Sequence, residues 1–140
     1  MTDEPGASGP TGETDLDAML DGLTVNRRPG TFVFAHLEVP VALGDGVEAL
    51  VAEDEATTVV ATRDRADSEG WSYSFEAAWL TLEVHSAPEA VGLTAAFSAE
   101  LTKHQISCNV IAGFFHDHLL VPTDRAEEAI TALEGLRQRR

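Results

Sequence analysis

Two histidines flank an aspartate at residues 116–118, inside the segment FFHDHLLVP. Imidazole and carboxylate groups this close together can bind a metal ion or transfer protons. The same residue types are also frequent where a chain turns between two strands. The triplet alone is therefore compatible with a chemical site or with a turn, and the flanking sequence has to distinguish them.

Two further histidines could take part in a metal site. The four imidazoles that could converge belong to His85, His104, His116 and His118. No HExxH segment, cysteine pair or other known ligand spacing accompanies them. Adjacent residues of a strand also point to opposite faces, which separates neighbouring side chains. We therefore expect no metal and no cofactor at these histidines.

The composition is that of a chain able to bury its own core. It has 140 residues, 44% of them hydrophobic, which suits one domain or two very small intertwined ones. The single cysteine, Cys108, excludes an intramolecular disulfide, and no apolar run is long enough to span a bilayer. The chain opens without a signal-peptide pattern, so we expect a cytoplasmic protein.

The net charge restricts the classes of partner. The chain carries 24 acidic against 9 basic residues, which gives a formal net charge of −15. Such a field repels the phosphate backbone of nucleic acids and the anionic headgroups of membranes. We therefore expect neither nucleic acid nor membrane as a partner.

The first half of the sequence indicates a tail followed by a β-α-β unit. Residues 1–13 are rich in Gly, Pro, Ser and Thr, which predicts a disordered tail, and residues 16–23 place leucines at helical spacing. The remaining elements are expected as strands at 31–39, 56–63 and 71–75, two helical turns at 46–53 and a loop at 64–70.

The second half indicates the order strand-helix-strand-strand-helix. Leu80, Leu82 and Val84 alternate with other residues, so only one face of their strand need be core. Because GFFHD joins two adjacent strands, the triplet begins where a hairpin turns. The elements are strands at 78–85, 106–113 and 118–122, and helices at 89–104 and 124–136, the last with Asp124 and Glu127 spaced as a capping box.

A short internal echo indicates two related halves. Phe32 precedes Val59-Val60-Ala61 much as Trp79 precedes Val110-Ile111-Ala112. A helix is expected between the two members of each pair, and the first helix is the shorter. The echo therefore predicts two similar β-α-β units.

The segment VHSAPEAVGLTAAFSAELTKHQISCNVIAGFFHDHLLVP, residues 84–122, resembles an ACT domain, a module that commonly binds amino acids and regulates metabolic proteins. More narrowly, the chain is similar to small bacterial proteins in which an ACT domain follows an ACT-like half. The short motifs that recur in those proteins are HS, EAVGLTAAFS, ISCNV and HDH. After the tail, the resemblance implies an ACT-like half at residues 14–76 and an ACT domain at residues 77–137.

The resemblance also implies the fold class. It is α+β and ferredoxin-like, with an antiparallel sheet, helices packed on one face and two related halves. The second half lacks the last strand of the βαββαβ pattern. We expect that strand to come from the first half or from residues 71–76.

A ligand site is implied between the loop HSAPEAVGL and a strand of a neighbouring ACT unit. The loop leads into a helix whose first amides have no intrahelical acceptor, and the positive end of the helix favours a carboxylate such as that of an amino acid. Gly92 allows ligand or backbone to approach closely. By motif position, the ligand-binding candidates are Ser86, Val91, Gly92, Leu93 and Thr94, with Asn109 and Val110 opposite.

Plainer interpretations compete with several of these roles. Ser86 can cap the helix together with Glu89, and Gly92 can serve only close packing of helix against strand. Cys108 is typical of a small core residue rather than a nucleophile. Core or interface positions are expected for Trp71, Trp79 and Phe114.

The sequence thus predicts a non-catalytic regulatory module that binds an amino acid between ACT units. The alternative is a structural or protein-interaction domain without a ligand. We expect no enzyme, because no nucleophile beside a base, phosphate loop or pair of acids on a shared face is present. We also expect a homodimer, because a sheet covered by helices on one side leaves a face or an edge to be covered.

Overall fold

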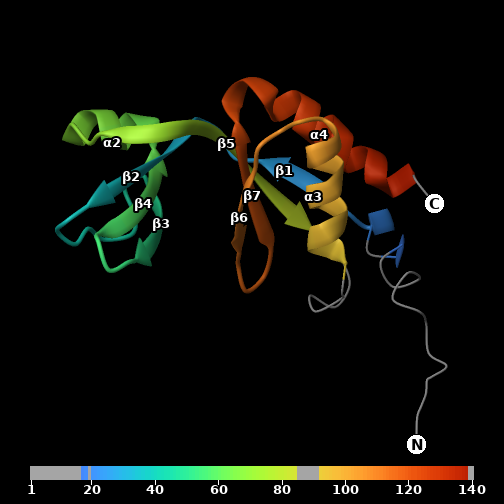
Figure 1. Ribbon diagram of the computed structural model, residues 1–140, viewed down its shortest axis with the longest axis horizontal. Coiled ribbons are helices and arrows are strands. Elements are labelled where there is room, and N and C mark those ends of the chain that lie inside the picture. Colours follow the sequence, from blue (N-terminus) through green and yellow to red (C-terminus); the bar gives the residue numbers. More distant parts are fainter. Residues whose placement is uncertain (1–16, 19, 85–91, 139–140) are drawn as a thin grey trace, which may run out of the picture.

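The computed structural model describes residues 17–18, 20–84 and 92–138, and the predicted tail lies outside these residues (Figure 1). Residues 17–18 and 20–21 are helical, as the leucine spacing predicts. The strands are β1 (Thr24–Arg27), β2 (Phe32–Leu37), β3 (Val47–Ala52), β4 (Thr57–Thr62), β5 (Tyr73–Glu83), β6 (Asn109–Ala112) and β7 (Asp117–Pro122). The helices are α2 (Arg63–Glu69), α3 (Leu93–Lys103) and α4 (Ala126–Glu134), with short 3-10 helices η2 (Thr123–Arg125) and η3 (Gly135–Gln138).

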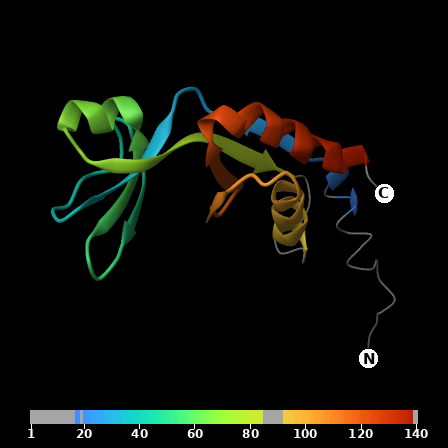
Figure 2. The same cartoon turned by 45° about the horizontal axis from the view of Figure 1, so that its top comes forward.

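The strands form one antiparallel sheet in the order β3-β4-β2-β5-β7-β6, with β1 beside β5. β5 is common to both halves, because its beginning pairs with β2 and its end pairs with β7 and β1. Figures 1 and 2 show it running from the part that carries α2 to the part that carries α3 and α4. β1 thus supplies the second half with the strand that it lacks, which confirms that expectation. The predicted boundary between residues 76 and 77 falls inside β5 and stays a prediction.

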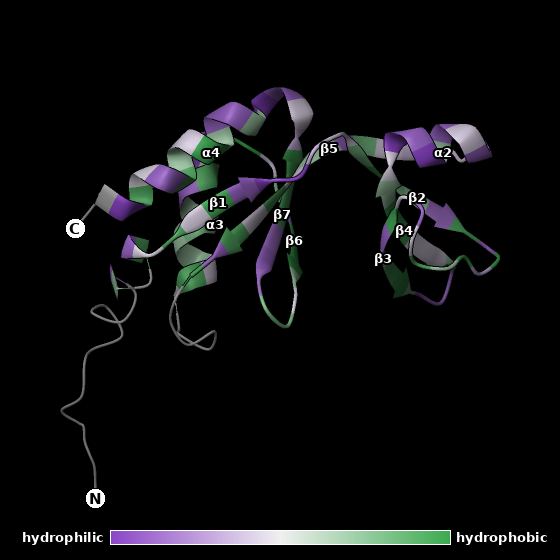
Figure 3. Cartoon of the chain, turned by 180° about the vertical axis from the view of Figure 1, so that it is seen from behind, coloured by the Kyte–Doolittle hydropathy of each residue, from purple (hydrophilic) through white to green (hydrophobic). Residues whose placement is uncertain are grey.

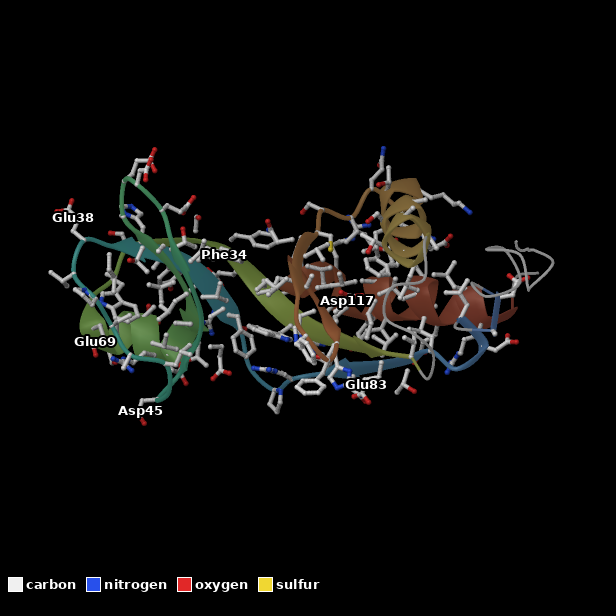
Figure 4. The ribbon with its side chains drawn as sticks, turned by 90° about the horizontal axis from the view of Figure 1, so that it is seen from below. Phe34, Glu38, Asp45, Glu69, Glu83 and Asp117 are labelled. Carbon is white, nitrogen blue, oxygen red and sulfur yellow. The ribbon has the colours of Figure 1, made fainter. Side chains whose placement is uncertain are left out.

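Helices pack on one face of the sheet, as predicted, yet the other face is also partly buried. Leu80 and Leu82 lie in the core beneath α3 and α4, whereas Trp79, only 2% exposed, lies on the opposite face with Phe32 and Leu120. The expectation that only one face of this strand is core is therefore wrong. The cause is the pairing of β5 with both β2 and β7, which surrounds Trp79 with their side chains. Figure 4 looks onto this second face, where Phe34 is labelled.

A β-bulge at Phe75 sets which residues of β5 face which side. Phe75 has a φ of 57°, in the left-handed region, and the pairing with β2 shifts register there. Tyr73 packs with the core of the first half, while Phe75 and Ala77 both join Trp79 on the opposite face. The extra residue thus resets the alternation of side chains along the strand. It also explains why the sequence reads as two strands, 71–75 and 78–85, where the structure has one.

The first half contains β3 where two helical turns are expected. Positive φ angles at Gly44, Asp45 and Gly46 are incompatible with the start of a helix, and the β-branched Val47 and Val51 favour a strand. β2 therefore continues into β3 through a loop, and the expected β-α-β unit is wrong.

The expected loop at residues 64–70 is instead α2, because local capping outweighs the lack of an apolar stripe. The Thr62 hydroxyl accepts a hydrogen bond from the Arg65 amide, and Gly70 ends the helix with a φ of 72°. Arg65 and Glu69 form an ion pair one turn apart. Only Ala66 is buried, and Figure 3 accordingly shows α2 as largely hydrophilic.

The second half confirms the predicted order of elements. β5, α3, β6, β7 and α4 follow one another as expected. The predicted capping box is wrong, because the chain passes through η2 before α4 begins, and Arg125 at the N-cap makes no side-chain capping bond. No described helix is long and apolar enough to cross a membrane.

The two related halves are confirmed, but their correspondence differs from the predicted echo. β4 corresponds to β7, and the segments ATTVVATRDRA and HDHLLVPTDRA each contain a strand that leads into a helix. Arg65 and Arg125 occupy matching positions: the first donates to the Asp45 carbonyl at 2.7 Å, the second to the His104 carbonyl at 2.9 Å. Each arginine therefore fastens the loop that precedes the neighbouring strand.

The bulge generates a prediction about Phe75. Both Phe75→Gly and Phe75→Ala remove the ring, but only glycine adopts the left-handed backbone without strain, so the glycine variant should be more stable by about 1 kcal/mol. Urea unfolding measures the difference. At Ser74, an exposed residue of the same strand without a positive φ, the order should reverse. An alanine variant at 75 as stable as the glycine variant would contradict the assignment of strain.

Candidate ligand site

A cavity of about 260 Å³ lies where the start of α3, the end of β5 and the β6–β7 hairpin meet. The pairing of β5 with β7 brings the hairpin to this cavity, because Leu82 of β5 lies opposite Asp117 of β7. Figure 4 labels Asp117 and also Glu83, the last residue of β5. The lining residues are Leu82, Val84, Leu93, Thr94, Ala112, Gly113, Phe114, Phe115, His116 and Asp117.

The start of α3 places its first residues, Leu93 and Thr94, at this cavity. Gly92 is the N-cap with a φ of 101° and brings no side chain that could cap the helix. The first turn closes through a bond from the Ala96 amide to the Gly92 carbonyl at 2.8 Å. The amides of Leu93 and Thr94 therefore precede the first intrahelical donor. Leu93 is buried in the core and fixes the helix start, while Thr94 is exposed.

Glycine at position 92 is explained by the backbone alone. A φ of 101° lies in a region that residues with a β-carbon rarely adopt. A substitution such as Gly92→Val would strain the helix start whether or not a ligand binds there. Asp117 is therefore a better residue than Gly92 for testing the site.

The hairpin answers the question raised by the HDH triplet. The Gly113 amide donates to the His116 carbonyl at 3.0 Å, so His116 lies in the turn, and β7 begins at Asp117. Asp117 lines the cavity, whereas the His118 ring lies against Trp79 on the other face of the sheet. The triplet is therefore a turn and the start of a strand, and its three side chains are not assembled as one site.

The described residues hold no group of three His, Cys, Asp or Glu side chains able to bind a metal ion. His104 lies on the helical side of the molecule, 3.3 Å from Glu100 and 3.6 Å from Glu128. His118 is engaged with Trp79, and His85 lies outside the described residues.

The structure brings together some of the predicted ligand-binding residues. Leu93 and Thr94 line the cavity, and Gly92 adjoins them. Asn109 and Val110 lie on β6 opposite Leu120 and Leu119, at the end of the hairpin away from the turn, and do not line the cavity of their own chain. Ser86 and Val91 lie outside the described residues. The role of all these residues in binding stays a prediction.

Sequence reasoning missed the hairpin side of the cavity. Phe114 and Phe115 are 89% and 80% exposed and contact each other edge to face, with ring centroids 5.0 Å apart. Trp79 is buried and Trp71 partly buried, as expected, whereas Phe114 is not a core residue and its expected alternative, an interface position, stays a prediction. The two adjacent phenylalanines in the hairpin turn could have indicated a binding surface from the sequence alone. Turns seldom carry large apolar side chains unless these make a contact.

Cys108 has the expected character of a core residue. It is partly buried and packs against the main hydrophobic cluster of the second half. Burial raises the pKa of its thiol to about 11. The thiol is therefore protonated and unreactive at neutral pH.

The fold consists of two ACT-like halves that share one antiparallel sheet, and family models match both halves. Residues 11–78 match one model described as an ACT domain, and residues 74–135 match a second model with the same description. The chain belongs to the ACT domain family. No curated protein matches the sequence.

Solved structures agree with this assignment. A Vibrio cholerae protein of unknown function, described as a possible transport protein, is 37% identical, with a TM-score of 0.81 over 91% of this chain and 100% of that one. Clostridium acetobutylicum aspartate kinase, described as allosteric, has a TM-score of 0.63 at 11% identity over 82% of this chain and 34% of its own. The ligand-free regulatory subunit of Thermus thermophilus aspartate kinase has a TM-score of 0.61 at 10% identity, over 80% and 95%. At these identities, the two aspartate kinase structures show a shared fold with this chain.

The raised thiol pKa predicts how Cys108 titrates. Thiolate absorbance should rise around pH 11 rather than near the ordinary value of 9. Because the folded pKa is raised, the stability linked to this group is present below pH 9 and is lost as pH rises through the folded pKa. Thiol-specific reagents should react slowly at neutral pH until urea unfolds the chain. A thiol that ionises at its ordinary pH would contradict its burial.

Proposed function

We propose that this protein is a non-catalytic regulatory module that binds an amino acid in the cavity between α3, β5 and the β6–β7 hairpin. The observation that carries the proposal is the combination of groups that line one space. The amides at the start of α3, which precede the first intrahelical bond, suit a carboxylate, and the Asp117 carboxylate suits an ammonium group. A zwitterionic amino acid presents both groups.

The size and the lining of the cavity restrict which ligands fit it. About 260 Å³ is less than the roughly 300–1,000 Å³ typical of sites for drug-sized molecules, so a small metabolite fits better. Leu82, Val84 and Leu93 offer an apolar wall, and Phe114 and Phe115 stand beside it. Burying apolar surface there contributes about 25 cal/mol per Å². An uncharged, apolar amino-acid side chain is therefore the best match, and the net charge of −15 disfavours acidic ones.

A second ACT unit completes the proposed site. Asn109 and Val110 are exposed on β6, an edge strand, and a neighbouring copy can place them against the Ser86–Thr94 segment of this chain. In this arrangement Ser86, Val91, Gly92, Leu93 and Thr94 bind the ligand from one copy, and Asn109 and Val110 from the other. A cytoplasmic homodimer is part of this proposal.

The regulatory role is supported by the relatives. The aspartate kinases that share the fold are described as allosteric or as carrying a regulatory subunit. Fold similarity at this identity is an analogy and does not transfer the regulated enzyme. The alternative, an interaction domain without a small ligand, is favoured by one observation: the nearly complete exposure of Phe114 and Phe115.

The proposal predicts an amino-acid-induced rise in melting temperature that depends on Asp117. Among the twenty amino acids, leucine, valine or phenylalanine should stabilise the native chain, because a ligand bound only by the native state raises stability by RT ln(1 + [L]/Kd). Asp117→Asn should lose most of this rise by removing the charge that pairs with the ammonium group. Asp124→Asn, an exposed carboxylate outside the cavity, should keep it. A thermal-shift screen gives the values.

Two outcomes would count against the site. If no amino acid shifts the melting temperature, the interaction-domain alternative stands. If an amino acid shifts wild type and Asp117→Asn equally, the ligand binds elsewhere. Lysine or arginine as the strongest stabiliser would mean that Asp117 recognises a side chain rather than the α-ammonium group.

Self-association predicts a mass twice that of the chain in light scattering at micromolar concentration. Phe114→Ser combined with Phe115→Ser should shift the protein towards monomer, because these rings are the most exposed large apolar groups near the edge strand. Val39→Ser with Leu43→Ser, 67% and 65% exposed in the β2–β3 loop, is the matched control and should leave the dimer intact. A wild-type monomer throughout would exclude the shared site.

A further inference from the structure

Trp79 of β5 lies at the junction of the two halves. The Arg28 guanidinium carbon lies 4.1 Å from the centre of the Trp79 ring, and the Phe32 ring lies 5.3 Å away, both contributed by the first half and its connection to β1. The His118 ring of β7 lies 5.4 Å away. Arg28 also forms an ion pair with Glu48 of β3 at 2.6 Å. A continuous set of contacts thus leads from β3 to β7.

The hydrogen bonds define the state of His118. The Trp79 indole N–H donates to Nδ1 of His118 at 3.2 Å, and the Thr81 hydroxyl lies 3.0 Å from the same nitrogen. An indole nitrogen is only a donor, so Nδ1 must carry a lone pair. The bond from Trp79 thus requires a neutral imidazole with its proton on Nε2, and the Thr81 hydroxyl is then the second donor near Nδ1.

The opposite edge of the same ring faces Gly113, in the hairpin that lines the candidate site. A β-carbon at Gly113 would lie 3.1 Å from Nε2 of His118 and 2.8 Å from the His116 carbonyl oxygen. Glycine at this position therefore leaves the space that the imidazole occupies. One edge of the His118 ring thus faces Gly113, and the other accepts the hydrogen bond from Trp79.

We propose that neutral His118 fastens the site-lining hairpin to the first half through Trp79, and that protonation of the imidazole releases this connection. A protonated Nδ1 would place an N–H against the indole N–H, and the new positive charge would face Arg28. The hairpin would then lose the His118 hydrogen bond to Trp79, and with it the polar connection through Arg28 to Glu48, while the backbone pairing of β5 with β7 remains. His118 is a positioning residue in this proposal, and the consequence for ligand binding rests on the proposed function.

The charged surroundings of His118 favour the neutral form. The connection between β1 and β2 contributes Arg28, with Glu48 of β3 beyond it, while β5 contributes the uncharged Trp79 and Thr81 and β6 the uncharged Ile111. Burial, then Arg28, then His116 lower the pKa of His118 below its ordinary value, and Asp117 opposes them. Stability linked to His118 is accordingly present above the ordinary pKa and is lost as pH falls through the folded pKa.

Nuclear magnetic resonance of the whole chain between pH 8 and pH 5 tests this proposal without any ligand. The imidazole signals of His118 should titrate below the ordinary histidine value, and the amides of Gly113 and Glu48 should follow the same midpoint. Trp79→Phe keeps a ring for Arg28 to stack on but removes the N–H donor. In this variant the His118 midpoint should rise, and the Glu48 amide should no longer follow it.

Three further variants separate this connection from general effects. Arg28→Gln should also raise the His118 midpoint, which keeps the proposal testable if Trp79→Phe does not fold. Trp71→Phe, a tryptophan of the first half without contact to His118, and His116→Gln should leave the Glu48 amide following the His118 midpoint. The proposal is wrong if His118 titrates at or above its ordinary value, if neither Trp79→Phe nor Arg28→Gln moves the midpoint, or if the chain unfolds before His118 titrates. Because no amino acid is present, these outcomes are distinct from a failure of the proposed ligand site.

Discussion

Backbone pairing along β5 joins three strands from both halves of the chain, and most other features of the molecule depend on it. β2 pairs with its beginning, and β7 and β1 pair with its end, so neither ACT domain has a complete sheet without this one strand. The bulge at Phe75 allows the strand to serve both halves, because it resets which side chains face the helices. A strand shared in this way makes independent unfolding of the two halves costly.

β5 also positions the candidate site on one face of the sheet and the contact between Trp79 and His118 on the other. Alternating residues of β5 face opposite sides, so Leu82 reaches the cavity while Trp79 and Thr81 face His118. β7 repeats this division, with Asp117 on the cavity side and His118 on the other. A change in the contacts on one face of the β5–β7 pair therefore affects the contacts on the other face, because adjacent residues of the same strands make them.

The sequence predicted the second half well because its elements carry apolar periodicity. The first half was predicted poorly for two physical reasons: α2 is stabilised by caps and an ion pair rather than an apolar stripe, and a glycine-containing loop prevents a helix before β3. The repeat of ATTVVATRDRA in HDHLLVPTDRA would have revealed α2. Leu93 and Thr94 followed from the family resemblance, but Asp117 did not, because its place in the cavity depends on the register of β5 with β7.

Hydrogen–deuterium exchange of the whole protein, with and without the most stabilising amino acid, tests the location of the site most directly. Binding between the start of α3 and the β6–β7 hairpin should slow amide exchange at residues 93–95 and 112–117, because the ligand covers these amides. Residues of α2, on the far side of the molecule in Figure 1, should exchange as before. Slower exchange confined to the first half, or no change with any amino acid, would contradict the account.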